Sequence, residues 1–124
     1  MPNNGTNYSW YISGGVAVSH DPAFFAHIYS RAKQGLNMQT YEQDFLARQY
    51  DSCTILQEEM GAAKAWLAAM AAGAESENVT VQYCMALPRH ILQSASFPRV
   101  THARATHDYG QSQTVSETIQ FIHF

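Results

Sequence analysis

The sequence predicts an α/β domain built from parallel strand–helix units. Segments with strand propensity alternate with segments of helical spacing, in the order strand, helix, strand, helix, strand, short helix, strand. Such alternation is typical of a parallel sheet with right-handed crossovers. The 124 residues, 46% of them apolar, suffice for one domain with a substantial core. A complete TIM barrel takes about 250 residues, so the length excludes one.

The N-terminal part predicts a lead-in, a strand and a helix. Residues 1–9 are polar and rich in turn formers, and we expect a flexible lead-in. Residues 10–18 are aromatic and β-branched, and they read as a strand that the pair Gly14-Gly15 interrupts. A glycine pair there predicts a bulge or a close backbone approach. A helix over 22–34 follows, with Asp21 as its cap, Pro22 at its first position and Gly35 at its end.

The middle of the chain predicts a second strand and a second helix. Residues 36–41 form a short strand that ends in polar residues. Residues 45–56 are a connection to which the pattern assigns no structure. Residues 57–74 are rich in Ala, Glu, Met and Leu, which favour a helix.

The C-terminal part predicts two more strands. They cover 79–85 and 99–106, and Pro88 begins a short helix or turn between them. The periodicity of the last residues fits a helix and a strand equally well. We therefore expect a domain over 10–110 and a tail of uncertain structure over 111–124.

Composition and charge restrict the partners. The net charge is −3 and the basic residues do not cluster, which argues against a nucleic-acid partner. No apolar run is long enough to span a membrane, and no signal peptide is evident, so we expect a cytoplasmic protein without a membrane partner. Two cysteines, Cys53 and Cys84, do not make a disulfide framework, and we expect two reduced, buried thiols. The six histidines show no metal-ligand spacing.

Charged residues follow three of the predicted strands. Glu42 and Asp44 come after the strand over 36–41, and Arg89 comes after the strand over 79–85. Arg104 and Asp108 lie at the end of the strand over 99–106. In parallel α/β folds, ligands meet the carboxyl ends of the strands, so we expect these side chains at one rim.

Two carboxylates that face each other across a sugar are the machinery of glycoside hydrolysis. One attacks or activates water, and the other protonates the leaving oxygen. A neighbouring arginine keeps a carboxylate ionised or binds substrate hydroxyls. Tyr41, Tyr83 and Tyr109 would supply apolar faces for a pyranose ring.

Three short motifs resemble the α-galactosidase-like glycoside hydrolases, which are retaining TIM-barrel enzymes. The motifs are Tyr41-Glu42-Gln43-Asp44, Tyr83-Cys84-Met85 and Arg104-Ala-Thr-His-Asp108. They are similar to the ends of the family's fourth, fifth and sixth strands. Residues 10–110 as a whole resemble strands three to six, which is a half-barrel or partial TIM-barrel-like domain.

The resemblance implies roles for individual residues. The nucleophile is Asp44, which matches by residue type, or Glu42, which matches by spacing, and Asp108 is the acid/base. The implied substrate-binding residues are Arg104, Tyr41, Tyr83, Cys84, Arg89 and His107. No metal and no organic cofactor are implied.

Two functions remain open at this point. The chain is a glycoside hydrolase-like domain acting on an α-glycoside, with the missing strands supplied by a homo-oligomer, a dimer that closes the barrel. Alternatively it is a non-catalytic, self-assembling half-barrel fragment that retains carbohydrate binding. A flavodoxin-like binding domain is a weaker third reading, because Gly14-Gly15 lies inside a strand-like segment and not between a strand and a helix.

Overall fold

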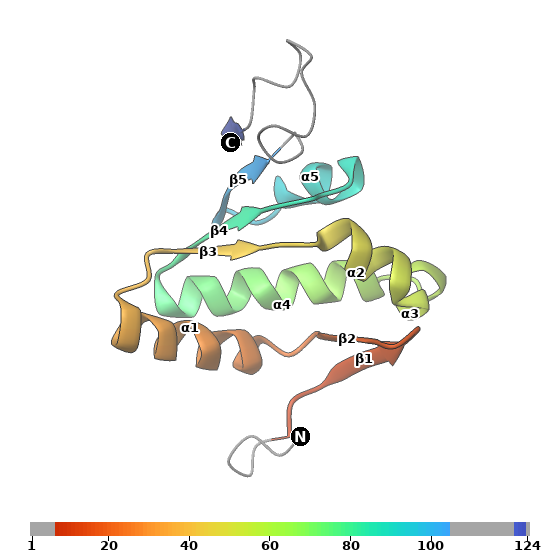
Figure 1. Cartoon of the computed structure of the whole chain (residues 1–124), viewed down its shortest axis with the longest axis horizontal. Coiled ribbons are helices and arrows are strands. Elements are labelled where there is room, and N and C mark those ends of the chain that lie inside the picture. The colour runs from red at the N-terminus through yellow and green to blue at the C-terminus, as the bar shows by residue number, and fades with distance from the viewer. Residues whose placement is uncertain (1–6, 105–120, 124) are drawn as a thin grey trace.

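A computed structural model describes residues 7–104 and 121–123 of the chain (Figure 1). Its helices are α1 (Pro22–Leu36), α2 (Leu46–Ser52), α3 (Thr54–Glu58), α4 (Ala62–Glu77) and α5 (Pro88–Ser94). Its strands are β1 (Trp10–Ser13), β2 (Val16–Ser19), β3 (Thr40–Gln43), β4 (Thr80–Tyr83), β5 (Val100–Arg104) and β6 (Phe121–His123).

The main sheet confirms the predicted α/β class. Its strand order is β3-β4-β5-β6; β3, β4 and β5 are parallel, and β6 is antiparallel to β5. The parallel strands thus follow one another in chain order, with helices in the connections. Within the described residues the sheet does not close into a barrel.

The first predicted strand is a hairpin and does not join the main sheet, which corrects the expectation of a single strand over 10–18. β1 and β2 pair antiparallel as a separate two-stranded sheet. Gly14 and Gly15 form the two-residue turn, both with positive φ, at 58° and 76°. A side chain at Gly14 would lie 1.9 Å from the Ser52 carbonyl oxygen, so the predicted close backbone approach is confirmed. A glycine pair between short β-branched runs is a hairpin signal, which our sequence interpretation overlooked.

Helix α1 begins as predicted and ends later. The Asp21 carboxylate accepts from the Ala23 N–H at 2.9 Å, and Pro22 occupies the first turn. The helix continues through Gly35 and ends at Asn37, whose φ of 52° forms a left-handed cap. The strand predicted over 36–41 therefore begins only at Thr40, and Glu42 lies inside it.

The connection over 45–56 contains two short helices, α2 and α3, which the sequence did not reveal. Helix α4 then begins at Ala62, five residues later than predicted, because Gly61 has a φ of 85° and interrupts the helical backbone. Helix α4 packs along α1 (Figure 1). At Gly73 the two backbones approach so closely that an added Cβ would lie 2.5 Å from the Phe25 Cβ.

The last elements agree with their predictions within a few residues. β4, α5 and β5 lie inside the ranges expected for them. Part of the ambiguous tail, residues 121–123, is a strand. None of the helices in the described ranges is both long and apolar enough to cross a membrane.

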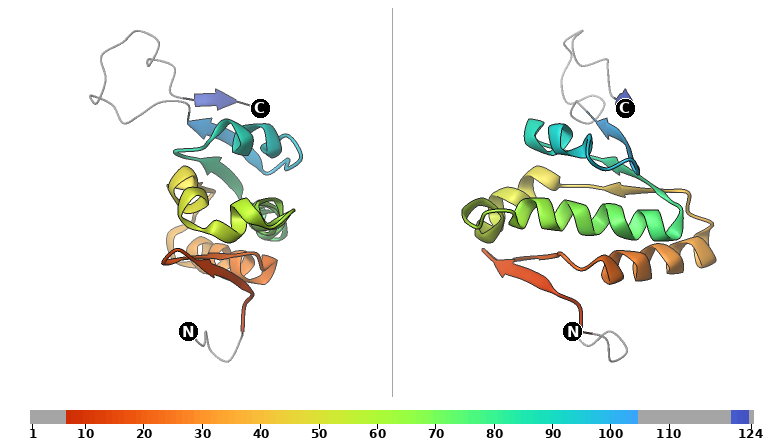
Figure 2. Two further views of the ribbon diagram at one scale, coloured as in Figure 1. Left: turned by 90° about the vertical axis from the view of Figure 1, so that its right-hand side faces the viewer. Right: turned by 180° about the vertical axis from the view of Figure 1, so that it is seen from behind.

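The two faces of the main sheet differ in chemistry. Tyr41, Val81, Tyr83 and Ala103 point to one face, where they join the core with residues of α1 and α4. Figure 2 shows α4 next to β3, with α1 packed along α4, in two further views. On the other face the side chains are polar and none of the described ones belongs to the core: Thr40, Glu42, Thr80, Gln82, His102 and Arg104. Parallel sheets usually bury both faces, so this polar face is unusual.

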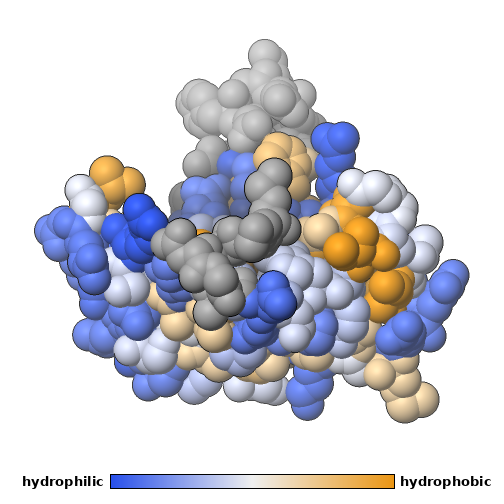
Figure 3. Space-filling view, turned by 90° about the horizontal axis from the view of Figure 1, so that it is seen from below, coloured by the Kyte–Doolittle hydropathy of each residue, from blue (hydrophilic) through white to orange (hydrophobic). Residues whose placement is uncertain are grey.

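The outer surface carries scattered apolar side chains. Among the described residues the exposed large ones are Trp10, Ile12, Leu36, Phe45, Met60, Met85 and Leu92. Seen from below, the surface is mostly hydrophilic, with hydrophobic residues confined to small areas (Figure 3). Single exposed apolar residues are normal on soluble domains.

Candidate functional site

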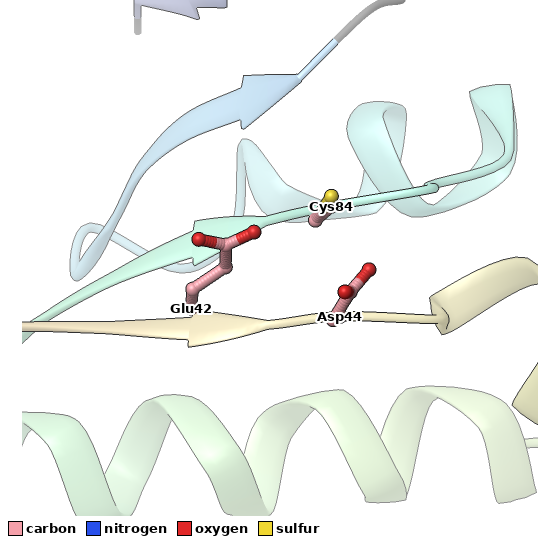
Figure 4. A group of neighbouring side chains, drawn as sticks. All are labelled: Glu42, Asp44 and Cys84. Carbon is pink, nitrogen blue, oxygen red and sulfur yellow. The ribbon is translucent and has the colours of Figure 1, made fainter. Parts of the chain in front are cut away.

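Three potential ligand or catalytic side chains meet at the carboxyl ends of β3 and β4. Carboxylate oxygens of Glu42 and Asp44 and the Cys84 sulfur all lie within 4.8 Å of one another. Glu42 is exposed, Asp44 is half-buried and Cys84 is buried. Figure 4 shows the three side chains projecting from neighbouring strands toward the same space. Both acids belong to the end of one strand, β3, and the neighbouring strand β4 contributes Cys84.

Backbone hydrogen bonds fix the position of this group. The Cys84 N–H donates to the Gln43 carbonyl at 2.9 Å, which extends the β3–β4 ladder past its last paired residues. The Leu46 N–H donates to the Cys84 carbonyl at 3.4 Å, and the Ala47 N–H donates to the Met85 carbonyl at 2.8 Å. The first turn of α2 is therefore tied to the segment that follows β4, and the strand ends cannot move independently.

Strained backbone follows both strands. Phe45, directly after Asp44, has a φ of 58°, and Met85, directly after Cys84, has a φ of 50°. Bulky residues rarely adopt this left-handed conformation. The Asp44 carboxylate accepts from the Phe45 N–H at 2.7 Å and so holds the turn. Backbone strain tends to gather at functional sites, because it persists only where the surroundings enforce it.

The electrostatics of the group centre on the thiol. Burial, followed by the hydrogen bonds to Asp44 and Glu42, raises the pKa of Cys84 to about 12. The Arg104 guanidinium acts in the opposite direction, which places Arg104 of β5 within electrostatic reach of the same group. Cys84 is thus a neutral thiol at pH 7 that faces two carboxylates and one cation.

A row of polar residues crosses the sheet beside the group. Glu42 pairs in register with Gln82, and Gln82 pairs with His102. Two residues earlier in each of β3 and β4, the Thr40 and Thr80 hydroxyls lie 2.8 Å apart. Gln82 and His102 were not singled out from the sequence, although their alternation with apolar residues along the strands was a usable signal.

Two predicted substrate-binding residues do not join the group. Tyr41 and Tyr83 alternate with Glu42 and Gln82, so they point to the helix-covered face. Tyr83 is fully buried, and burial raises the pKa of its hydroxyl. Neither ring is therefore available as a platform for a sugar at this rim.

The remaining predicted residues lie elsewhere or outside the description. Arg89 is the second residue of α5, and its guanidinium donates to the Tyr50 hydroxyl and lies 4.3 Å from the centre of the Tyr50 ring. Arg89 also lines a surface hollow of about 340 Å³ with Glu58 and Lys64, apart from the carboxylate group. Asp108 and His107 fall outside the described residues.

Comparisons with family models, with curated proteins and with solved structures find no match for this chain. The geometry of the strand ends and the short motifs beside them are therefore the features of this chain that point to a function.

Proposed function

We propose that the chain is a glycoside hydrolase-like domain that acts on an α-glycoside at the polar face of its sheet. The observation that carries the proposal is the convergence of Glu42, Asp44 and Cys84 within 4.8 Å, with Arg104 in electrostatic reach. Acidic, neutral and basic hydrogen-bonding groups then face one open polar surface. That combination suits the hydroxyl-rich surface of a sugar.

The carboxylates supply the first half of the chemistry. An oxygen of Asp44 or Glu42 attacks the anomeric carbon while the glycosidic C–O bond breaks. Glu42 lies in β3 and Asp44 directly follows that strand, so both approach a substrate from the same side and neither serves as the opposing acid for the other. Asp108 takes that role in the proposal: it gives its proton to the leaving oxygen, then accepts a proton from the water that hydrolyses the glycosyl ester.

Three parallel strands leave this active site incomplete within the described residues. Retaining hydrolases enclose the sugar between two carboxylates about 5–5.5 Å apart, which requires walls on both sides. A homo-oligomer would supply the second wall, although a contact through the β3 edges alone joins two open sheets and does not close the barrel expected from the sequence. β6 already pairs with β5, so the outer edge of β3 is the parallel edge left for such a contact.

Turnover of aryl α-glycosides by the full chain tests the proposal. We expect Asp44→Asn or Glu42→Gln, and also Asp108→Asn, to reduce kcat at least about a thousandfold, because each removes a group from the reacting atoms. Thr40→Val is a matched control, since Thr40 lies on the same face of β3 and carries no titratable group. Equal turnover in all four variants and the wild type would exclude the carboxylate mechanism.

The second candidate is a non-catalytic, self-assembling fragment that binds carbohydrate. The open edge of β3 and the unclosed sheet favour it. Absence of turnover together with saturable sugar binding, lost in Arg104→Gln, would favour this candidate over the enzyme. A monomer that neither turns over nor binds sugar would exclude both.

A further inference from the structure

We propose that Glu42, Asp44 and Cys84 form a binding site for a single thiophilic divalent cation such as Zn²⁺. The proposal does not depend on hydrolysis, because it concerns the ligand atoms and not a substrate. It assigns to Cys84 a function different from the sugar contact that its motif suggested.

The geometry of the donors supports a common metal ion. The three ligand atoms lie within 4.8 Å of one another, from two strands that the sheet ladder holds together. Zinc binds sulfur at about 2.3 Å and carboxylate oxygen at about 2.0–2.2 Å, so one ion between these atoms requires only small side-chain rotations. The backbone that carries the donors is already ordered, so little chain entropy is lost on binding.

The chemical nature of the donors selects the kind of metal. Ca²⁺ and Mg²⁺ take oxygen ligands, whereas a sulfur in the first coordination sphere favours Zn²⁺ and other soft or borderline ions. Cys84 is only 2% exposed, and its sulfur lies within 4.8 Å of an oxygen of each carboxylate. A buried thiol at that distance is the component that an ordinary surface pair of acids lacks.

The site is accessible and its charge is favourable. Glu42 is exposed and Asp44 is half-buried, so an ion can enter from solvent and retain a water as fourth ligand. Two carboxylates outweigh the single Arg104 cation that acts on the thiol. Binding replaces the thiol proton, which passes to solvent: the S–H bond breaks, a metal–sulfur bond forms, and no electron is transferred.

Cobalt(II) is the spectroscopic probe for the test, and Zn²⁺ is the competitor. We expect the reduced full chain to bind one Co²⁺, with thiolate-to-metal charge-transfer absorption in the near ultraviolet that Zn²⁺ abolishes and Mg²⁺ does not. Cys84→Ser should remove that absorption. Asp44→Asn should weaken Zn²⁺ binding, measured by calorimetry, at least about tenfold.

The other cysteine provides the matched control. Cys53 is equally buried, but its sulfur lies 3.4 Å from the Ser13 hydroxyl, away from the carboxylates. Cys53→Ser should keep both the absorption and the affinity. Absorption that survives in Cys84→Ser, affinity unchanged in Asp44→Asn, or no saturable binding by the wild type would each overturn the proposal. Asp44→Asn decides the case if Cys84→Ser does not fold.

Metal binding and hydrolysis use the same two carboxylates, but they are measured separately. A chain that binds Co²⁺ through sulfur but hydrolyses no glycoside supports the cation site alone. A chain that turns over glycosides without metal binding supports only the hydrolase proposal.

Discussion

At the scale of single residues, unusual backbone conformations lie beside the candidate site, and a buried histidine with an unpartnered ring nitrogen lies in α5. Phe45 and Met85 hold left-handed backbone directly after two site residues. His90 is fully buried, its Nδ1 accepts from the Leu87 N–H at 3.1 Å, and its Nε2 has no partner among the described residues. These residues carry two testable predictions.

The strain at Phe45 predicts an order of stability between two substitutions. Phe45→Gly and Phe45→Ala remove the same half-exposed ring, but only glycine adopts a φ of 58° without steric cost. We expect the glycine variant to be the more stable by about 1–2 kcal/mol in urea unfolding. Equal stabilities would mean that residue 45 does not hold a left-handed conformation in solution.

His90 predicts a pH dependence of stability. Burial, followed by the nearby Arg89 charge, lowers the pKa of His90 to about 4, below the usual 6.5. The unfolded chain therefore binds a proton more readily, so the stability is fully present above pH 6.5 and is lost as the pH falls toward 4. At about 1.4 kcal/mol per pKa unit, we expect a loss of about 3 kcal/mol between urea unfolding curves at pH 7.5 and pH 4.

Asparagine is the control for this titration. Its side-chain oxygen also accepts from the Leu87 N–H, but it does not titrate. His90→Asn should lose most of the dependence between pH 6.5 and pH 4. An undiminished dependence in this variant would assign it to other groups.

At the scale of elements, the pairing of α1 with α4 depends on the absence of a side chain at Gly73. An added Cβ there would lie 2.5 Å from the Phe25 Cβ and 2.8 Å from the Ala26 nitrogen. The helices must separate to accept it. Alanine is the better helix former by about 1 kcal/mol, so propensity and packing oppose each other at this position.

We expect packing to prevail. Gly73→Ala should destabilise the chain by about 1–3 kcal/mol, measured by thermal or urea unfolding. Gly35→Ala is the matched control in α1, because no atom lies within 4 Å of its added Cβ. That variant should be neutral or more stable by up to about 1 kcal/mol. A stabilised Gly73→Ala would show that the helices pack less closely than described.

Local signals in the sequence predicted which helices and strands form better than they predicted the residues at which these elements begin and end. Asp21 and Pro22 fixed the start of α1 because capping is a local interaction. Its end was misplaced, because Gly35 tolerates helical backbone and the left-handed cap forms at Asn37. Helices α2 and α3 lacked a local signal, since they are held by contacts from distant segments, such as the Leu46 N–H bonded to the Cys84 carbonyl.

The candidate site was predictable to the extent that it depends on topology. Parallel strands in chain order placed Glu42, Asp44 and Cys84 at one end of the sheet. The face on which each side chain lies depends on register, which a one-residue shift reverses. Tyr41 and Tyr83 were therefore assigned to the site, whereas in the structure Tyr83 is buried in the core and Tyr41 packs against it, partly buried.

At the scale of the whole molecule, the outer edge of β3 is the feature that governs assembly. The Gln39 and Gln43 carbonyls accept from the N–H groups of Thr80, in β4, and Cys84, directly after it. Thr40 and Glu42 alternate with the residues that face β4, so their backbone groups point away from it. Unpaired backbone at an edge is a template for another strand. A second copy of the chain can pair there.

This edge predicts the oligomeric state. We expect a dimer by light scattering, and we expect Thr40→Pro to shift it toward the monomer, because proline removes an outward N–H. Thr40→Val keeps that N–H and should remain dimeric. Circular dichroism confirms that each variant is folded. A dimer that Thr40→Pro does not affect would place the contact between copies at another surface. A monomeric wild type would contradict the predicted dimer.

The two edges of the main sheet differ, and this difference limits how many copies of the chain can join through strand pairing. Within the part of the chain that the structure describes, one edge is the parallel strand β3, and the other is the three-residue antiparallel strand β6. Very short edge strands make poor templates for further pairing. Copies joined β3 to β3 about a twofold axis use up the better edge in both partners, so the assembly stops at two. A chain with two equivalent edges could instead polymerise into filaments, and β6 is the element that separates this protein from that outcome.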